Sequence, residues 1–311
     1  MKTRLAALVA GAILAVAIPA RAGIYYVTVA GIGGEPVYDQ EFTQLARDLD
    51  KLFKSSGVDV HVFTLTGATR AEMTEVLAKV AAQAKPGDDF VLILIGHGTD
   101  DGYQYKFNLA GPDISAGELA GLCDKIPSRR QLIVDTSEAS GGSVAALEGR
   151  GRAVIAATKD GREKNATVFA RYFVQALHDP GADLNKDGSI SALEAFEYAR
   201  RHTADFYTAQ KRLATEHAVF EDTGDHQAVR APSAGTREGL FLSTFTLIRL
   251  GGAREIYNDP AKRALLAKKE ELEREIDTLK YHKAAMSQED YTRRISKALI
   301  ELARVQEELD K

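Results

Sequence analysis

Short, almost wholly apolar runs alternate along this chain with segments whose apolar residues recur at helical spacing. The apolar runs cover residues 24–30, 58–65, 89–95, 131–134 and 153–157. Helical spacing of apolar residues is clear between them, in Phe42, Leu45, Leu49, Leu52 and Phe53 and again in Met73, Val76, Leu77 and Val80. Strands that are apolar on both faces and alternate with amphipathic helices are typical of a parallel sheet covered on both sides. The pattern predicts a three-layer α/β domain over residues 23–255.

The later part of this domain is less regular. Residues 169–177 have the spacing of another helix, and residues 221–238 are polar enough to predict an exposed loop. The apolar run at residues 240–249 follows that loop. We interpret it as the sixth strand of a mostly parallel sheet.

Beyond Pro260 the composition changes to Lys, Glu, Leu, Ala and Arg. Apolar residues mark two helices, one containing Leu265, Leu272, Ile276 and Leu279 and the other Tyr291, Ile295, Leu299, Leu302, Val305 and Leu309. Ser287 separates the two as a helix N-cap, with Asp290 three residues later. We expect an antiparallel, coiled-coil-like helical hairpin over residues 260–311. A hairpin that packs on its own domain or is solvated, and one that binds a protein partner, both remain open.

The first 22 residues have the pattern of a secretory signal peptide. Lys2 and Arg4 precede an apolar stretch, and Ala20-Arg21-Ala22 provides small residues at a cleavage site. An uncleaved anchor is the alternative, but the stretch is shorter than the roughly 20 residues of a spanning helix. Cleavage would start the mature chain at Gly23, in the periplasm or outside the cell, with no later membrane span.

Charge and cysteine content narrow the possibilities further. The formal net charge is −4, and loss of the three basic residues of the leader makes it more negative, which argues against nucleic acid as a partner. Cys123 is the single cysteine, so it cannot form a disulfide within the chain. Its helical neighbourhood favours a small buried apolar residue over a nucleophile.

Residues 183–194 match the twelve-residue calcium loop of an EF-hand at each coordinating place. The predicted calcium ligands are Asp183, Asn185, Asp187, Ser189 through its carbonyl, Ser191 through water, and Glu194 through both oxygens. Gly188 permits the sharp turn, and the alternative is a polar turn without an ion. A single unpaired loop indicates a structural calcium site and not a sensor.

Two of the apolar runs end in short polar turns that contain catalytic residue types. His97-Gly98 follows residues 89–95, and Asp135, Ser137 and Ser140 follow residues 131–134. The carboxyl ends of parallel strands meet at one edge of a sheet, so we expect these turns to lie together. The simpler alternatives are a histidine that caps its strand and serines that cap the next helix.

Together these turns resemble the caspase and legumain clan of cysteine peptidases, and the legumain-like proteins of bacteria in particular. The resemblance covers roughly residues 24–250 and implies that His97 is the base, that Gly98 N–H binds an oxyanion, and that Ser137 occupies the position of the nucleophilic cysteine. It also places Asp160 and Glu163 in a loop where clan members bind substrate. A Gly-x-Ser-x-Gly motif of serine hydrolases is absent.

Three functional hypotheses follow. The first is an exported homologue of these peptidases, catalytically impaired by serine at the nucleophile position, that binds a peptide or protein in its cleft. The second is an active serine-dependent hydrolase in which His97 activates Ser137 or Ser140. The third is a calcium-dependent adaptor whose site is vestigial.

Overall fold

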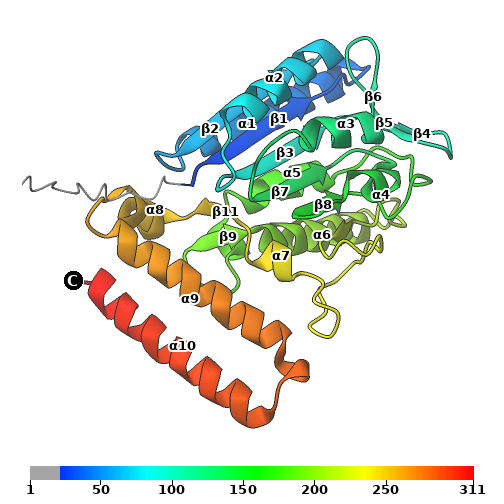
Figure 1. The fold of residues 1–311 in the computed structure, drawn as a ribbon. Helices are drawn as coiled ribbons and strands as arrows, with labels where there is room; N and C mark the ends of the chain where they lie inside the picture. The colour runs from blue at the N-terminus through cyan, green and yellow to red at the C-terminus, as the bar shows by residue number, and fades with distance from the viewer. Residues whose placement is uncertain (1–21) are drawn as a thin grey trace, which may run out of the picture.

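A six-stranded sheet lies at the centre of the computed structural model, which describes residues 22–311 (Figure 1). Its strands run in the order β2, β1, β3, β7, β8, β10. They span Ile24–Ala30 (β1), Val60–Thr66 (β2), Asp89–Ile95 (β3), Arg130–Asp135 (β7), Arg152–Ala156 (β8) and Val219–Glu221 (β10). The first five are parallel, and β10 pairs antiparallel with β8. The predicted mostly parallel α/β sheet is confirmed, whereas the predicted signal peptide lies outside the described residues except for Ala22.

Alternate residues of the central strands pack into two separate cores. Tyr26 and Val91 face a core completed by helices α1 (Pro36–Lys54), α5 (Phe169–Ala176) and α6 (Ala192–Ala209). Val27 and Leu92 face the other, completed by α2 (Arg70–Gln83), α3 (Ala116–Cys123) and α4 (Val144–Leu147). Because side chains alternate across a strand, an apolar strand of this kind needs cover on both faces. The result is the predicted three-layer arrangement.

The prediction of a sixth strand at residues 240–249 is wrong. Residues Leu240–Ser243 form a short helix, α7, and only Thr246–Arg249 form a strand, β11. Strand β11 pairs antiparallel with β9 (Ser189–Ser191) in a separate two-stranded sheet. The run is apolar because Leu242 and Phe245 are buried in the α5–α6 core, and a short apolar run does not by itself distinguish a helical turn from a strand.

Shorter elements shape the edges of the domain. Strands β4 (Gly98–Asp100), β5 (Tyr105–Phe107) and β6 (Ile114–Ser115) form a three-stranded antiparallel sheet after β3. Two 3-10 turns cover Ser140–Gly142 and Pro180–Ala182. Cys123 ends α3 and is buried, and burial raises the pKa of its thiol to about 12, in agreement with the interpretation of an unreactive apolar residue.

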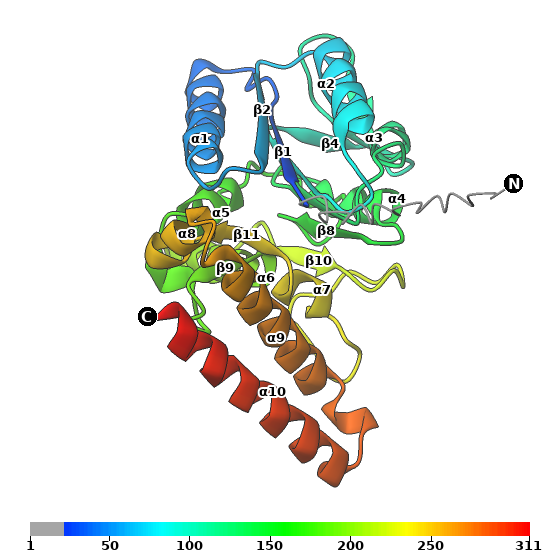
Figure 2. The ribbon, with the colours of Figure 1, turned by 60° about the vertical axis from the view of Figure 1, so that its left-hand side comes forward.

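The C-terminal segment forms two long antiparallel helices beside the domain (Figure 2). Helix α8 (Gly251–Asn258) leads into α9 (Arg263–Tyr281), then a 3-10 turn at Lys283–Ala285 and α10 (Gln288–Leu309). Ser287 caps α10, as predicted, by accepting a hydrogen bond from the N–H of Asp290 at 3.1 Å. Helix α9 lies against the domain, where Glu270 pairs with Arg249 at 2.6 Å.

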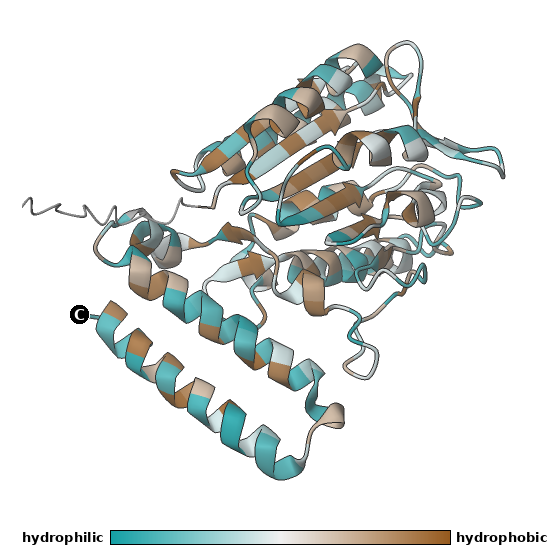
Figure 3. Ribbon diagram, viewed as in Figure 1, coloured by the Kyte–Doolittle hydropathy of each residue, from teal (hydrophilic) through white to brown (hydrophobic). Residues whose placement is uncertain are grey.

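Apolar residues are concentrated along the central strands, and α9 and α10 mix hydrophilic and hydrophobic residues (Figure 3). Leu272, Val305 and Leu309 form a small core between the two helices. None of the helices in residues 22–311 combines the length and apolar composition that crossing a bilayer requires.

Truncation of the central strand is expected to destabilise the fold strongly. Leu92 is fully buried in β3, so Leu92→Ala removes apolar contacts and leaves a cavity, at a cost of about 2–5 kcal/mol in the free energy of unfolding. Leu213→Ala is the matched control, because Leu213 is 90% exposed and its loss should leave stability nearly unchanged. Urea denaturation of both variants measures the difference, and equal midpoints would contradict this packing.

Candidate functional site

The two polar turns do meet at one edge of the sheet. Strands β3 and β7 pair in parallel with Leu94 opposite Asp135, so that His97 and Ser137 leave neighbouring strands at the same edge. Gly98 begins β4, and a Cβ added there would lie 2.6 Å from Ser137 Oγ and 2.7 Å from a ring carbon of Tyr105. Only glycine permits this close approach between the two turns.

Both ring nitrogens of His97 contact oxygen atoms other than Ser137 Oγ. Nδ1 lies 2.8 Å from Oε1 of Glu138, and Nε2 lies 3.1 Å from the backbone carbonyl oxygen of Gly33. A carboxylate and a carbonyl only accept hydrogen bonds, so the ring satisfies both when each nitrogen carries a proton. The hydrogen bond with Glu138 accordingly raises the pKa of His97, against the opposing effect of burial.

Aromatic rings fix the orientation of the imidazole. The rings of Tyr38 and Phe42, both on α1, lie edge-on to His97 with centroid separations of 4.9 and 5.1 Å. Glu138 is half-buried, and its side chain is 14% exposed. His97 is therefore held against Glu138 and the Gly33 carbonyl, with neither ring nitrogen directed at Ser137.

Ser137 is fully buried and belongs to a different hydrogen-bonded group. Its Oγ donates to Oδ1 of Asp135 at 2.7 Å and lies 2.7 Å from the phenol oxygen of Tyr105. Because the serine has a single proton and gives it to the carboxylate, the tyrosine O–H must donate to Ser137. A chain of hydrogen bonds therefore runs from Tyr105 through Ser137 to Asp135.

The electrostatics of this chain follow from its burial. Burial raises the pKa of Asp135 to about 6, although the hydrogen bonds from Ser137 lower it. Its second oxygen, Oδ2, has no hydrogen-bond partner among residues 22–311. Burial and the Asp135 charge keep the pKa of Tyr105 well above its ordinary value, so the phenol stays protonated and acts only as a donor.

Ser140 lies in the 3-10 turn that follows Ala139, which has a φ of 57°. The Ser140 hydroxyl is buried, accepts the N–H of Thr158 at 3.2 Å, and ties the turn to the loop after β8. The interpretation of these serines as caps of the next helix is wrong. Ser143 is at the N-cap of α4, but its side chain accepts no hydrogen bond from the helix, and its hydroxyl donates to the carbonyl of Ser140 at 2.7 Å.

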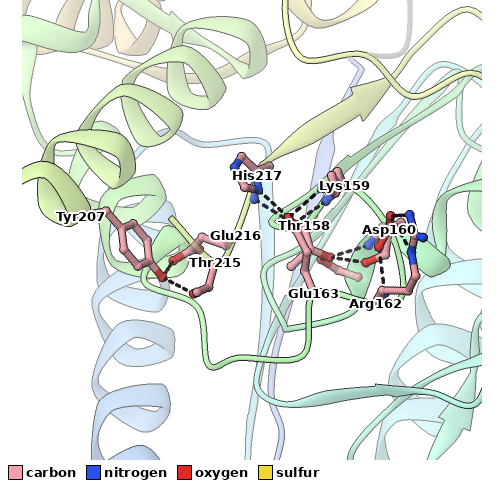
Figure 4. A network of polar contacts seen from close by, with 11 residues as sticks. Thr158, Lys159, Asp160, Arg162, Glu163, Tyr207, Thr215, Glu216 and His217 are labelled. Carbon is pink, nitrogen blue, oxygen red and sulfur yellow. Dashed lines mark hydrogen bonds and ion pairs between the residues drawn. The ribbon is translucent and has the colours of Figure 1, made fainter. Parts of the chain in front are cut away.

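Asp160 and Glu163 lie in the loop after β8, as expected, and both carboxylates have partners within the protein (Figure 4). Asp160 pairs with the guanidinium of Arg162 at 2.6 Å. Glu163 accepts the backbone N–H groups of Lys159 and His217, each at 3.0 Å, and its other oxygen contacts the His217 ring. Glu163 thus fastens this loop to the segment that leads into β10.

The predicted calcium loop folds back on itself and is closed by Glu194. Oε1 of Glu194 accepts the N–H of Leu184 at 2.9 Å, and Oε2 accepts the N–H of Ser191 at 2.9 Å. Asp183 accepts the N–H of Gly188 through Oδ2 at 3.2 Å, while its buried Oδ1 has no partner in the described chain. Residues 22–311 contain no group of three or more His, Cys, Asp and Glu side chains placed to hold a metal.

The other residues of the predicted calcium loop bond to one another and to strand β11. Asp187 Oδ1 accepts the backbone N–H of Ser189 at 2.7 Å, and the Asn185 side chain donates to Oδ2 of Asp187 at 2.9 Å. Ser189 and Ser191 lie in β9, which pairs with β11. The loop therefore joins the side chains of Asn185 and Asp187 and anchors its second half in a small sheet.

Tyr105 and Glu138 are the residues of this site that the sequence analysis missed. Tyr105 arrives from β5, 32 positions before Ser137, and no local pattern connects the two. Glu138 directly follows Ser137, and its acidic side chain beside the predicted nucleophile was a signal that could have been used.

The pairing with Glu138 should be visible in the titration of His97. In Glu138→Gln the carboxylate is lost, so the pKa of His97 should fall, as measured by NMR of the ring protons. The pair stabilises the fold below the ordinary histidine pKa of 6.5, and this contribution is lost as pH rises through the raised pKa of the folded protein. Glu289→Gln, exposed on α10, is the control. An unchanged His97 titration in Glu138→Gln would exclude the ion pair.

Comparison with known proteins agrees with this fold. Residues 45–183, which include both polar turns, match the family model of the caspase domain. No curated protein matches the chain. A crystal structure of a protein from Geobacter sulfurreducens is similar, with 15% identity, coverage of 74% of this chain and 100% of that chain, and a TM-score of 0.46. The caspase-domain match and the central sheet together show that the chain contains a domain of the caspase-like peptidase fold.

Proposed function

We propose that this protein is an exported, catalytically impaired homologue of caspase- and legumain-type peptidases that binds a peptide or protein without cleaving it. The observation that carries the proposal is the separation of the two expected catalytic groups into different hydrogen-bonded sets. His97 pairs with Glu138 and Gly33, whereas Ser137 pairs with Asp135 and Tyr105. Export rests on the leader pattern of residues 1–22.

Acyl transfer needs a nucleophile within hydrogen-bond reach of a base and open to substrate. A histidine that donates from both nitrogens has no lone pair with which to accept a proton. A serine hydroxyl is also a far weaker nucleophile than a thiolate unless a base activates it. Ser137 is completely buried, so a substrate carbonyl has no access to its Oγ. These three conditions together argue against turnover.

Two exposed features support a binding role. Tyr103, in the turn between β4 and β5, is 98% exposed. On α10, Leu299 and Ile300 are about half exposed, which leaves apolar surface on the hairpin for a protein partner. We assign the peptide or protein ligand to the sheet edge near His97, and a second protein contact to the C-terminal hairpin.

One observation favours the active alternative. Asp135, with a pKa of about 6, accepts directly from Ser137 and could take its proton if the turn opened to expose the serine. This would make a serine hydrolase that uses an aspartate in place of His97.

Peptide hydrolysis separates these functions. The purified protein, tested on a peptide library with calcium present, should show no hydrolysis above the Ser137→Ala background, since the serine is buried and both ring nitrogens of His97 contact other acceptors. Ser137→Cys is the informative variant: activity that appears only there means a cleft that lacks just its nucleophile and still supports binding. Wild-type cleavage that Ser137→Ala abolishes would overturn the proposal in favour of the hydrolase.

We also propose that residues 183–194 hold one structural calcium ion. The support is the buried Oδ1 of Asp183, which has no hydrogen-bond partner in the described chain. Burying an unpartnered carboxylate oxygen costs free energy, and a bound cation would offset that cost. Glu194 is buried as well, and burial raises its pKa. Side-chain oxygens of Asp183, Asn185, Asp187 and Glu194 with the carbonyl of Ser189 form an all-oxygen set, which suits calcium.

Calcium binding is expected in the wild-type protein and not in Asp183→Ala. Titration calorimetry should give one site, and saturation at about 100 times the Kd should add about 2.7 kcal/mol to stability. Asp225→Ala serves as the control, because Asp225 is an exposed acidic residue in a turn outside the loop. Calcium heat that persists unchanged in Asp183→Ala would exclude this loop as the site.

A further inference from the structure

A pocket of about 290 Å³ lies at the edge of the sheet opposite His97 and Ser137. It opens where β1, β3 and β7 begin, and β11, α8 and α9 form its other walls. Five arginine side chains line it: Arg129, Arg130, Arg249, Arg263 and Arg274. We call this the arginine pocket. Neither the caspase-domain match nor the candidate site accounts for it.

Acidic side chains neutralise only part of this charge. Asp89 pairs with both Arg129 and Arg130, at 3.0 and 2.7 Å. Glu270 pairs with Arg249. These are the two carboxylates that line the pocket, and Arg129, Arg130 and Arg249 are their partners. Three guanidinium groups therefore share two negative charges, which leaves an excess of positive charge before Arg274 is counted.

Arg274 is the least compensated of the five. It is half-buried on α9, and its guanidinium makes no hydrogen bond or salt bridge with another residue in the described chain. Burial and the nearby charges of Arg130 and Arg129 lower its pKa, and the charges of Glu270 and Glu271 offset this only in part. A partly buried cation among like charges is costly unless an anion joins it.

The other guanidinium groups are held in fixed planes. Arg130 donates to the carbonyl of Thr244 at 2.8 Å and stacks on the ring of Phe245 at 4.7 Å. Arg249 makes two hydrogen bonds to Glu270 and lies 4.2 Å from the centre of the Tyr257 ring. Such preorganised arginines lose little side-chain entropy when they bind a further oxygen ligand.

We propose that the arginine pocket binds a compact anion with two or more negative charges, of the phosphoryl class. Planar guanidinium groups match phosphoryl oxygens in pairs, and a pocket of this volume suits a pyrophosphate or a small phosphate ester. Arg129, Arg130 and Arg249 belong to the sheet domain, whereas Arg263 and Arg274 belong to α9. A bound anion would join the hairpin to the domain.

Titration calorimetry with inorganic pyrophosphate tests the proposal, with ionic strength held constant by sodium chloride. The wild-type protein should bind pyrophosphate saturably, and Arg274→Gln should weaken binding about tenfold or more through loss of a charged donor. Arg129→Gln should weaken pyrophosphate binding as well. The Arg129 side chain is 51% exposed, so its replacement should not disturb folding, and this variant keeps the test valid if Arg274→Gln misfolds. Arg293→Gln, paired with Asp290 on α10 outside the pocket, should bind as the wild type does.

Two results would overturn the proposal: no saturable heat from the wild-type protein, or equal weakening by Arg293→Gln and Arg274→Gln. A sedimentation assay with phosphatidylcholine vesicles that contain phosphatidic acid identifies the source of the phosphoryl group. Vesicle binding that Arg274→Gln abolishes assigns it to a lipid headgroup, and pyrophosphate binding without vesicle binding assigns it to a soluble anion. None of these outcomes depends on His97 or Ser137, so the test is independent of the proposed peptide-binding function.

Discussion

Strands β3 and β7 lie side by side at the centre of the sheet with both faces covered, so the polar groups at their ends must find partners at one of two edges. At the carboxyl edge the emerging groups are His97, Asp135 and Ser137. At the amino edge they are Asp89 and Arg130, which pair with each other. The two edges therefore differ in kind: the first buries a hydrogen-bonded cluster of low net charge, and the second collects cations.

At the carboxyl edge, His97 and Ser137 belong to two separate hydrogen-bonded groups. A general base needs a nitrogen with a free lone pair. Both ring nitrogens of His97 contact hydrogen-bond acceptors, the Glu138 carboxylate and the Gly33 carbonyl. In a catalytic triad a carboxylate contacts one nitrogen of the histidine ring, and the other nitrogen contacts the nucleophile. Glu138 contacts Nδ1 of His97 in the same way, but Nε2 faces the Gly33 carbonyl and not a nucleophile.

The strands of the parallel sheet could be predicted because burial on both faces demands continuous apolar runs, as in residues 89–95. The edge strand β10 could not, since its three residues, Val219–Glu221, carry too little pattern. Residues 240–249 were misassigned as one strand because the run is mostly apolar. In the structure its first half is a short helix and only its second half is a strand. In the site, the placement of His97 beside Ser137 followed from strand order alone.

Side-chain partners were harder to predict than positions. Whether His97 bonds to Ser137 or to Glu138 depends on the backbone direction after β7, which no spacing rule encodes. Tyr105 reaches Ser137 through a three-stranded sheet that had no signal in the sequence. The arginines of the amino edge are scattered over residues 129–274, so only the docking of α9 brings them together.

The antiparallel pairing of β9 with β11 connects the predicted calcium loop to the arginine pocket. In that pairing Ser189, inside the acidic loop, lies opposite Arg249, which lines the arginine pocket. A displacement of either strand is passed to its partner through the backbone. If the proposed calcium ion and the proposed anion both bind, they act on the two strands of one pair, and any coupling between their affinities must be equal in both directions, because thermodynamic coupling is reciprocal.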